Sequence, residues 1–209
     1  LAYRTNQLTE EKSFMILPPL EQRLSDCCPA LVVLIFFYGV YFSKMLMQKR
    51  QGIKTHQIGR RKEKQFHRVE SLMGIATLVL PAVQILSVIL DWSLLPASVR
   101  FTGFCIGMLG DAIFLIAVVK MKDSWRAGIP DKDKTELVTA GIYKFSRNPA
   151  FLGFDFMYAG LLLMFFNPLT AVFTAFAIIM LHLQILQEEK YLADTFGEKY
   201  LEYKKHVFR

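Results

Sequence analysis

The chain has 209 residues, of which 53% are hydrophobic and 21% are charged, and its formal net charge at pH 7 is +7. Apolar runs recur at 29–47, 69–91, 98–121, 150–166 and 168–187. Each run approaches the roughly 20 residues that a membrane-spanning helix needs, whereas soluble helices alternate apolar and polar faces. The pattern argues against a soluble domain and predicts an all-α integral membrane protein with about five transmembrane helices.

Basic residues gather in three segments, at 44–68, 120–147 and 190–209. With five spans these segments all fall on one side of the membrane. The opposite side keeps Arg4, Lys12, Arg23 and Arg100. The positive-inside rule then predicts that the basic segments and the C-terminus are cytoplasmic and that the N-terminus is outside. Topology and anionic headgroups explain the basic excess, so we expect a membrane partner and no nucleic acid.

We divide the chain into three regions. Residues 1–28 form a mixed polar extension to which we assign no function, and residues 29–121 form three transmembrane helices. Residues 122–209 form a region with a helical hairpin and a C-terminal tail, and we expect it to bind a cofactor. The tail indicates a helix that breaks near Gly197 and lies either against the membrane or against the rest of the domain.

Small and acidic residues inside the apolar runs have different meanings. Gly103-x-x-x-Gly107 is a spacing that lets two helices approach closely, so we interpret it as a packing signal. Asp111 and Asp155 lie within runs three and four. A carboxylate facing lipid is costly, so each should face a partner or a cavity.

Asn167 and Pro168 alone separate the last two apolar runs. Such a tight joint predicts an antiparallel hairpin of two helices of similar length, whose open ends are level. The turn-rich segment around Arg147, before the hairpin, and Glu188, at its end, should therefore meet at the membrane boundary. We predict a cofactor site between these helix ends.

Glu188 and Glu189 would end a long apolar helix, where negative charge opposes the helix dipole. They are either ordinary solvated charges or the partners of a cationic ligand or of Arg147. Gln184 lies four residues earlier on the same helical face. His182 lies a turn deeper and is either a functional group or a packed, hydrogen-bonded side chain.

Arg147 stands beside Tyr143 and Phe151 at the start of a predicted helix. An arginine and aromatic rings at a helix N-terminus suit a ligand with an anionic group and a flat ring. Pro149 is a normal residue for the first helical turn. Gly141 allows the backbone to approach such a ligand closely.

Several of these motifs together resemble the isoprenylcysteine carboxyl methyltransferase family over about residues 120–208. The motifs are Leu137-Val138-Thr139-x-Gly141-Ile142-Tyr143, Arg147-Asn148-Pro149-x-Phe151-x-Gly153, Asn167-Pro168, Glu188-Glu189 and Gly197-x-x-Tyr200-x-x-Tyr203. Phospholipid N-methyltransferases and similarly folded sterol reductases share parts of the pattern.

The resemblance implies S-adenosylmethionine bound at the cytoplasmic boundary and a lipophilic acceptor that enters from the bilayer. It assigns the cofactor to Leu137, Val138, Gly141, Tyr143, Asn148, Pro149, Phe151, Glu188 and Glu189. It makes Arg147 and Glu188 the catalytic residues. Gln184, His182, Trp125 and Arg126 become candidates for the acceptor, although Trp125 and Arg126 could equally be interface anchors. We predict no metal site.

Methyl transfer from a sulfonium is an in-line displacement, so alignment and exclusion of water can supply most of the catalysis. The acceptor can be an isoprenylcysteine carboxylate or another lipid or small molecule. The alternatives are a phospholipid N-methyltransferase, an NADPH-dependent reductase with Arg147 and nearby lysines on the phosphates, and a non-enzymatic membrane carrier or scaffold. The sequence does not indicate the oligomeric state.

Overall fold

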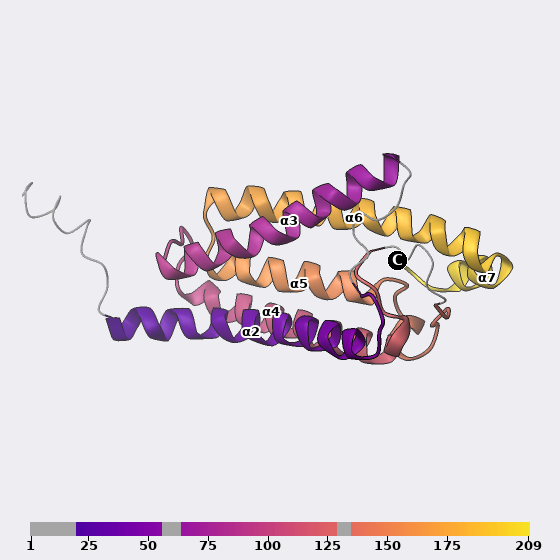
Figure 1. The fold of residues 1–209 in the computed structure, drawn as a ribbon. Helices are drawn as coiled ribbons and strands as arrows, with labels where there is room; N and C mark the ends of the chain where they lie inside the picture. The colour runs from indigo at the N-terminus through magenta and orange to yellow at the C-terminus, as the bar shows by residue number, and fades with distance from the viewer. Residues whose placement is uncertain (1–19, 56–63, 129–134) are drawn as a thin grey trace, which may run out of the picture.

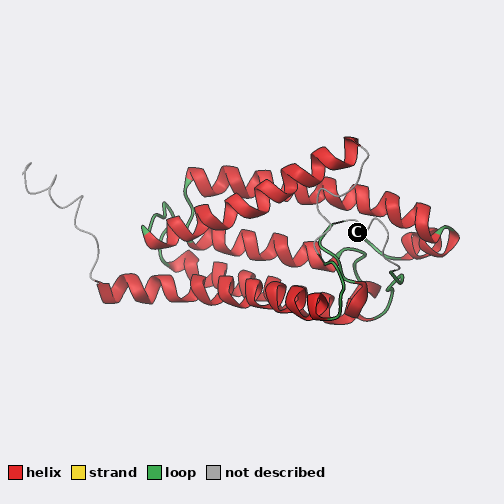
Figure 2. Ribbon diagram, viewed as in Figure 1, coloured by secondary structure: helices red, strands yellow, loops and turns green. Residues whose placement is uncertain are grey.

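The computed structural model describes residues 20–55, 64–128 and 135–209. Its elements, with η denoting a 3-10 helix, are α2 (Leu20–Arg50), α3 (Lys64–Ile89), α4 (Ser98–Met121), η1 (Lys122–Ser124), η2 (Gly141–Lys144), α5 (Pro149–Met164), α6 (Pro168–Phe196) and α7 (Glu198–His206). No strand occurs in the described ranges (Figure 2). The predicted all-α class is confirmed.

The long helices lie lengthwise in one bundle (Figure 1). α5 lies inside the bundle and packs mainly against α4, and α6 packs mainly against α3. The short helix α7 lies at one end of the bundle, and the C-terminus returns from it towards the start of α5. This end also holds η1 and η2, so most of the predicted site residues gather there.

Four helical segments in the described part of the chain are long and apolar enough to cross a membrane: Cys27–Arg50, Arg68–Ile89, Ser98–Ser124 and Pro168–Phe196. α5 is also apolar but has only 16 residues. It is therefore about 24 Å long, somewhat less than the roughly 30 Å hydrocarbon core. The predicted multi-pass membrane protein is confirmed.

Glycines bring the backbones of α4 and α5 into contact. A Cβ atom added to Gly160 would lie 2.5 Å from the backbone nitrogen of Gly107, and one added to Gly110 would lie 2.5 Å from that of Met157. A Cβ on Gly103 would lie 2.6 Å from the carbonyl oxygen of Gly160. The predicted packing role of Gly103 and Gly107 is confirmed, and the close approach holds the short helix α5 inside the bundle.

The joint between α5 and α6 is tied to the turn between α3 and α4. Asn167 is fully buried and caps α6 by accepting a hydrogen bond from the backbone N–H of Thr170 at 3.0 Å. Its side-chain amide donates to Ser87 Oγ and to the carbonyl oxygen of Trp92, at 3.0 and 3.1 Å. The tight hairpin that we predicted at Asn167 and Pro168 is confirmed, with these bonds holding its closed end.

The two arms of the hairpin are not of similar length, so that expectation was wrong. α5 has 16 residues and α6 has 29, and α6 continues past Glu188 to Phe196. Glu188 and Glu189 therefore lie within the helix and not at its end, and the dipole argument loses its force there. The predicted break near Gly197 is confirmed, because this residue has φ of +55° and separates α6 from α7.

Some expectations concern residues outside the described ranges. α2 begins at Leu20, earlier than the predicted start of the apolar run at residue 29. Residues 1–19 of the predicted extension lie outside the description, as do residues 56–63 of the basic loop and residues 129–134 of the second basic segment.

Replacement of Gly160 by leucine should separate α4 from α5, because backbone atoms already occupy the space of a Cβ atom. We expect Gly160→Leu in detergent to lower the melting temperature by at least about 5 °C, the size expected for severe overpacking. Gly39→Leu is the matched control, because a Cβ atom there meets nothing within 4 Å. Equal melting temperatures of the two variants would contradict this close helix contact.

Candidate active site

The two polar stretches that flank the hairpin meet at one end of the bundle, as predicted. The hydroxyl of Tyr203 donates to the carbonyl oxygen of Tyr143 at 2.5 Å. The backbone N–H of Arg147 donates to the carbonyl oxygen of Phe208 at 2.8 Å, within a short parallel bridge between Ser146 and Phe208. The C-terminal segment is therefore fastened to the segment that precedes α5.

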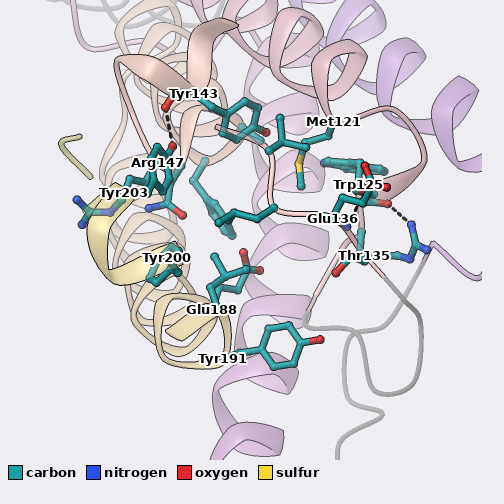
Figure 3. A pocket seen from close by; sticks show the side chains of 18 of the residues that line it. Met121, Trp125, Thr135, Glu136, Tyr143, Arg147, Glu188, Tyr191, Tyr200 and Tyr203 are labelled. Atoms are coloured by element: carbon teal, nitrogen blue, oxygen red, sulfur yellow. Dashed lines mark hydrogen bonds between the residues drawn. The ribbon is translucent and has the colours of Figure 1, made fainter. Parts of the chain in front are cut away.

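A cavity lies between these segments and the loop that follows η1. Figure 3 shows Tyr143, Arg147 and Tyr203 across the cavity from Trp125 and Glu136. Nine of the predicted site residues line it: Trp125, Arg126, Leu137, Val138, Tyr143, Arg147, Asn148, Phe151 and Glu188. We call it the polar cavity, since carboxyl, phenol and guanidinium groups reach its wall.

Gly141 and Pro149 shape this region without lining the polar cavity. Gly141 has φ of +69° and begins η2, and a Cβ atom on it would lie 3.1 Å from the side chain of Lys120. Pro149 is the first residue of α5, where a missing N–H has no cost. Both residues set the path of the chain around Tyr143.

Glu189 is the centre of an ion cluster behind the cavity. Its carboxylate is almost fully buried and accepts hydrogen bonds from Arg147 at 2.8 Å and from Arg209 at 3.0 Å, while the ammonium of Lys204 lies 3.3 Å away. Asn148 Nδ2 also donates to it at 3.4 Å. Glu189 does not line the polar cavity, so the structure separates it from the predicted cofactor site.

Arg147 is held by this cluster. Its Nε and Nη2 donate to Glu189, and its Nη1 donates to the carbonyl oxygens of Lys204 and Val207. The guanidinium that we predicted to hold an anionic group is thus engaged with protein acceptors at all three nitrogens. Its charge is balanced by Glu189, and it stiffens the wall of the polar cavity.

Glu188 lies on the other side of α6 and points into the polar cavity (Figure 3). Its Oε1 accepts a hydrogen bond from Gln184 Nε2 at 3.3 Å. Glu70 of α3 is fully buried and lies close enough to Glu188 for the two negative charges to repel each other. Of the two adjacent glutamates, Glu188 is therefore the one that faces the cavity, and neither Gln184 nor Glu70 neutralises its charge.

Three phenols of the cavity, those of Tyr143, Tyr200 and Tyr203, remain protonated near neutral pH. Burial, followed by the negative charge of Glu188, raises the pKa of Tyr143. Burial also raises the pKa values of Tyr200 and Tyr203 to about 12. All three hydroxyls therefore act as hydrogen-bond donors at physiological pH.

A second, larger cavity lies between α2, α3, α5 and α6. Its wall is mainly aromatic and aliphatic and includes Tyr38, Tyr41, Phe42, Met45, Met73, Thr77, Leu78, Pro81, Phe154, Leu181 and Gln184. We call it the apolar cavity. It shares a boundary with the polar cavity formed by Trp125, Arg126, Gly128, Ala150, Phe151 and Glu188.

The four predicted acceptor residues do not all lie together. Trp125, Arg126 and Gln184 line the apolar cavity, and the first two also line the polar one. His182 is exposed on the surface of α6 and lines neither cavity. It precedes Glu188 by six residues, which turns it about 120° around the helix, so the expectation that it reaches the site was wrong.

Sequence reasoning missed several residues of the polar cavity. Thr135, Glu136, Tyr191 and Leu192 line it but belong to no motif that we singled out. Tyr200 and Tyr203 also line it, although the sequence showed them only as part of a family pattern. Their spacing of three residues on a short helix places them on one face, which was the available signal.

The fold and the two cavities define a multi-pass helical membrane protein in which a polar site near one end of the bundle adjoins an apolar site inside it. Residues 102–194 match the model of the isoprenylcysteine carboxyl methyltransferase (ICMT) family. The resemblance indicated by the sequence motifs is thus confirmed for this part of the chain.

Three curated proteins illustrate the similarity. The chain is 32% identical over 122 residues to a protein-S-isoprenylcysteine O-methyltransferase of Saccharomyces cerevisiae, 57% of this chain and 51% of that protein. It is 32% identical over 114 residues to a probable enzyme of the same name from Oryza sativa subsp. indica, 52% of this chain and 59% of that protein. It is 31% identical over 110 residues to protein-S-isoprenylcysteine O-methyltransferase B of Arabidopsis thaliana, and the aligned part covers 50% of this chain and 55% of that protein.

The matched regions cover 51–59% of these three relatives, so the chain spans about half the length of the curated relatives that it matches. The match to the family model includes most of α4, all of α5 and most of α6. Phe151 lies in α5 and Glu188 in α6.

Removal of the charge on Glu189 should release the C-terminal segment, because Arg147, Lys204 and Arg209 would lose their shared counter-ion. We expect Glu189→Gln to destabilise the docked segment by about 3 kcal/mol, the usual size for breaking a buried ion pair. Amide hydrogen exchange at residues 198–209 should then be faster than in the parent protein.

Glu202→Gln is the matched control, since the Glu202 carboxylate is exposed and pairs with Lys205 on the surface of α7. If both variants exchange at the parent rate, the ion cluster does not hold the segment.

Proposed function

We propose that the chain is a membrane methyltransferase that transfers a methyl group from S-adenosylmethionine to a lipophilic acceptor. The observation that carries this proposal is the junction of the polar and apolar cavities at Trp125, Phe151 and Glu188. A water-soluble donor and a membrane-soluble acceptor need a polar and an apolar space with a common boundary, and this arrangement provides them. The similarity to protein-S-isoprenylcysteine O-methyltransferases supports it.

The polar cavity suits a cationic donor that carries a flat ring. Phe151 and Tyr143 provide aromatic faces, and Leu137 and Val138 provide apolar walls against which an adenine can lie. Glu188 provides a carboxylate that suits an amino or hydroxyl donor. We infer that Asn148 and the tyrosine hydroxyls complete the site, and that Arg147 positions the wall from its place in the ion cluster.

When bound, the donor supplies a methyl group on a positively charged sulfur. The acceptor atom forms a bond to the methyl carbon as the carbon–sulfur bond breaks and its electron pair stays on sulfur. The contribution of the protein is to align the two molecules and to exclude water from the junction. Trp125, which is 4% exposed, and Phe151 are placed to do so.

The apolar cavity suits the hydrocarbon part of the acceptor. Helices of the region at 29–121 provide part of its wall, with Tyr38, Met73 and Leu78, while residues 122–209 provide most of the donor site. An isoprenylcysteine carboxylate is one acceptor suggested by the names of the relatives. We further infer that the polar cavity and the C-terminus are cytoplasmic, in line with the basic segments at that end.

The reductase alternative finds less support in the geometry. An NADPH site needs cations for the phosphates, and Arg147, one of the cations predicted for that role, already donates to Glu189 and to two backbone carbonyls. A methyl donor without phosphates makes no such demand on the site.

Calorimetry with S-adenosylhomocysteine, the demethylated donor, tests the proposal. We expect the purified protein to bind it, and Glu188→Gln to weaken binding by about tenfold, because the lost hydrogen bonds involve a charged acceptor. Glu198→Gln, in an exposed carboxylate of α7 outside the polar cavity, should bind like the parent. The absence of binding by the parent protein, or binding of NADPH in its place, would refute the proposal.

A further inference from the structure

The wall of the apolar cavity holds a hydrogen-bond acceptor that the described residues leave without a donor. Gln184 is fully buried and lines this cavity. Its Nε2 donates to Glu188 Oε1, and this bond fixes the orientation of the amide, because only the NH₂ group can face a carboxylate. Gln184 Oε1 has no hydrogen-bond partner among the described residues. Burying a hydrogen-bond acceptor without a donor costs free energy, so we expect a bound ligand to donate a hydrogen bond to this atom.

Within the described residues, two carboxylates lie near this acceptor. Glu188 reaches the cavity from α6, and the buried carboxylate of Glu70 approaches it from α3. Arg126 is the cation at the shared boundary, and its Nη1 donates to the carbonyl oxygens of Asp123 and Trp125, at 2.5 and 2.9 Å. A carboxylate placed beside Gln184 would face the lone pair of Gln184 Oε1 and the like charge of Glu188.

We propose, on the basis of the methyltransferase function above, that the acceptor is an amphiphile with a nitrogen head group, an alkylamine in its ammonium form, held by Gln184 Oε1 and Glu188. An ammonium offers three hydrogen-bond donors and a positive charge, which match an amide oxygen and a carboxylate. Its hydrocarbon chain lies along Tyr38, Met73 and Leu78 in the apolar cavity.

The same arrangement supplies the proton acceptor that an ammonium requires. The ammonium gives one proton to the Glu188 carboxylate, and the nitrogen lone pair becomes available. That lone pair forms the bond to the methyl carbon of the sulfonium donor while the carbon–sulfur bond breaks and leaves its electron pair on sulfur. A carboxylate acceptor would need no such base, because it is already ionised at neutral pH.

Tryptophan fluorescence provides a binding readout that does not depend on turnover. The chain has two tryptophans, and Trp125 lies at the boundary of the two cavities. In a Trp92→Phe background in lipid nanodiscs, Trp125 is titrated with brominated hexadecylamine and with the matched brominated hexadecanoate. We expect the amine to quench at a concentration at least about tenfold lower, as a charged hydrogen bond implies.

Gln184→Leu and Glu188→Gln should each reduce this preference about tenfold. Glu202→Gln is the control, because this exposed carboxylate of α7 pairs with Lys205 and lines neither the polar nor the apolar cavity. It should keep the preference of the parent. Partition into the nanodisc lipid is the same for every variant, so a change in preference reports the cavity.

Equal quenching by both probes, preference for the carboxylate, or a preference unaffected by Gln184→Leu and Glu188→Gln would overturn the inference. Calorimetry with S-adenosylhomocysteine on the same preparations distinguishes failure of the amine inference from failure of the methyltransferase proposal. If the parent binds this compound but prefers the carboxylate, the amine inference fails and the methyltransferase proposal stands. If it does not bind the compound, the methyltransferase proposal itself fails.

Discussion

The buried carboxylate of Glu189 joins parts of the chain that are far apart in sequence. It binds Arg147 and Asn148 at the start of α5, and it binds Lys204 and Arg209 from the C-terminal segment. Because consecutive helical residues are turned by about 100°, a Glu189 fixed in this cluster directs Glu188 to another face of α6. The face of α6 that carries Glu188 forms part of the wall of the polar cavity. The ion cluster therefore determines where the site lies.

The membrane gives the second constraint. Close backbone contacts at Gly107, Gly110 and Gly160 hold α5 against α4, and α5 is shorter than the helices around it. Its N-terminal end therefore does not extend as far along the bundle as the C-terminal end of α6. Ala150 and Phe151, near that end of α5, line both cavities. A short central helix thus lets a site for a water-soluble molecule adjoin a space within the bilayer.

Hydropathy and the tight joint at Asn167 predicted the helices and the meeting of the two polar stretches, because both signals are local in sequence. They did not separate the roles of Glu188 and Glu189, since the partners of Glu189 include Lys204 and Arg209 from a tail that the sequence does not place in space. The apolar cavity was also missed, because residues such as Met73 and Leu78 look the same whether they face lipid, core or ligand. The expectation for His182 was wrong because its angular position on α6 was not counted.

The central claim is that donor and acceptor meet at the boundary formed by Trp125, Phe151 and Glu188. An experimental structure of the protein with S-adenosylhomocysteine tests it most directly. The account predicts the adenine beside Tyr143 and Phe151 and the sulfur atom at the boundary, facing the apolar cavity. The ligand bound elsewhere, or with its sulfur turned away from Glu188 and Trp125, would contradict it.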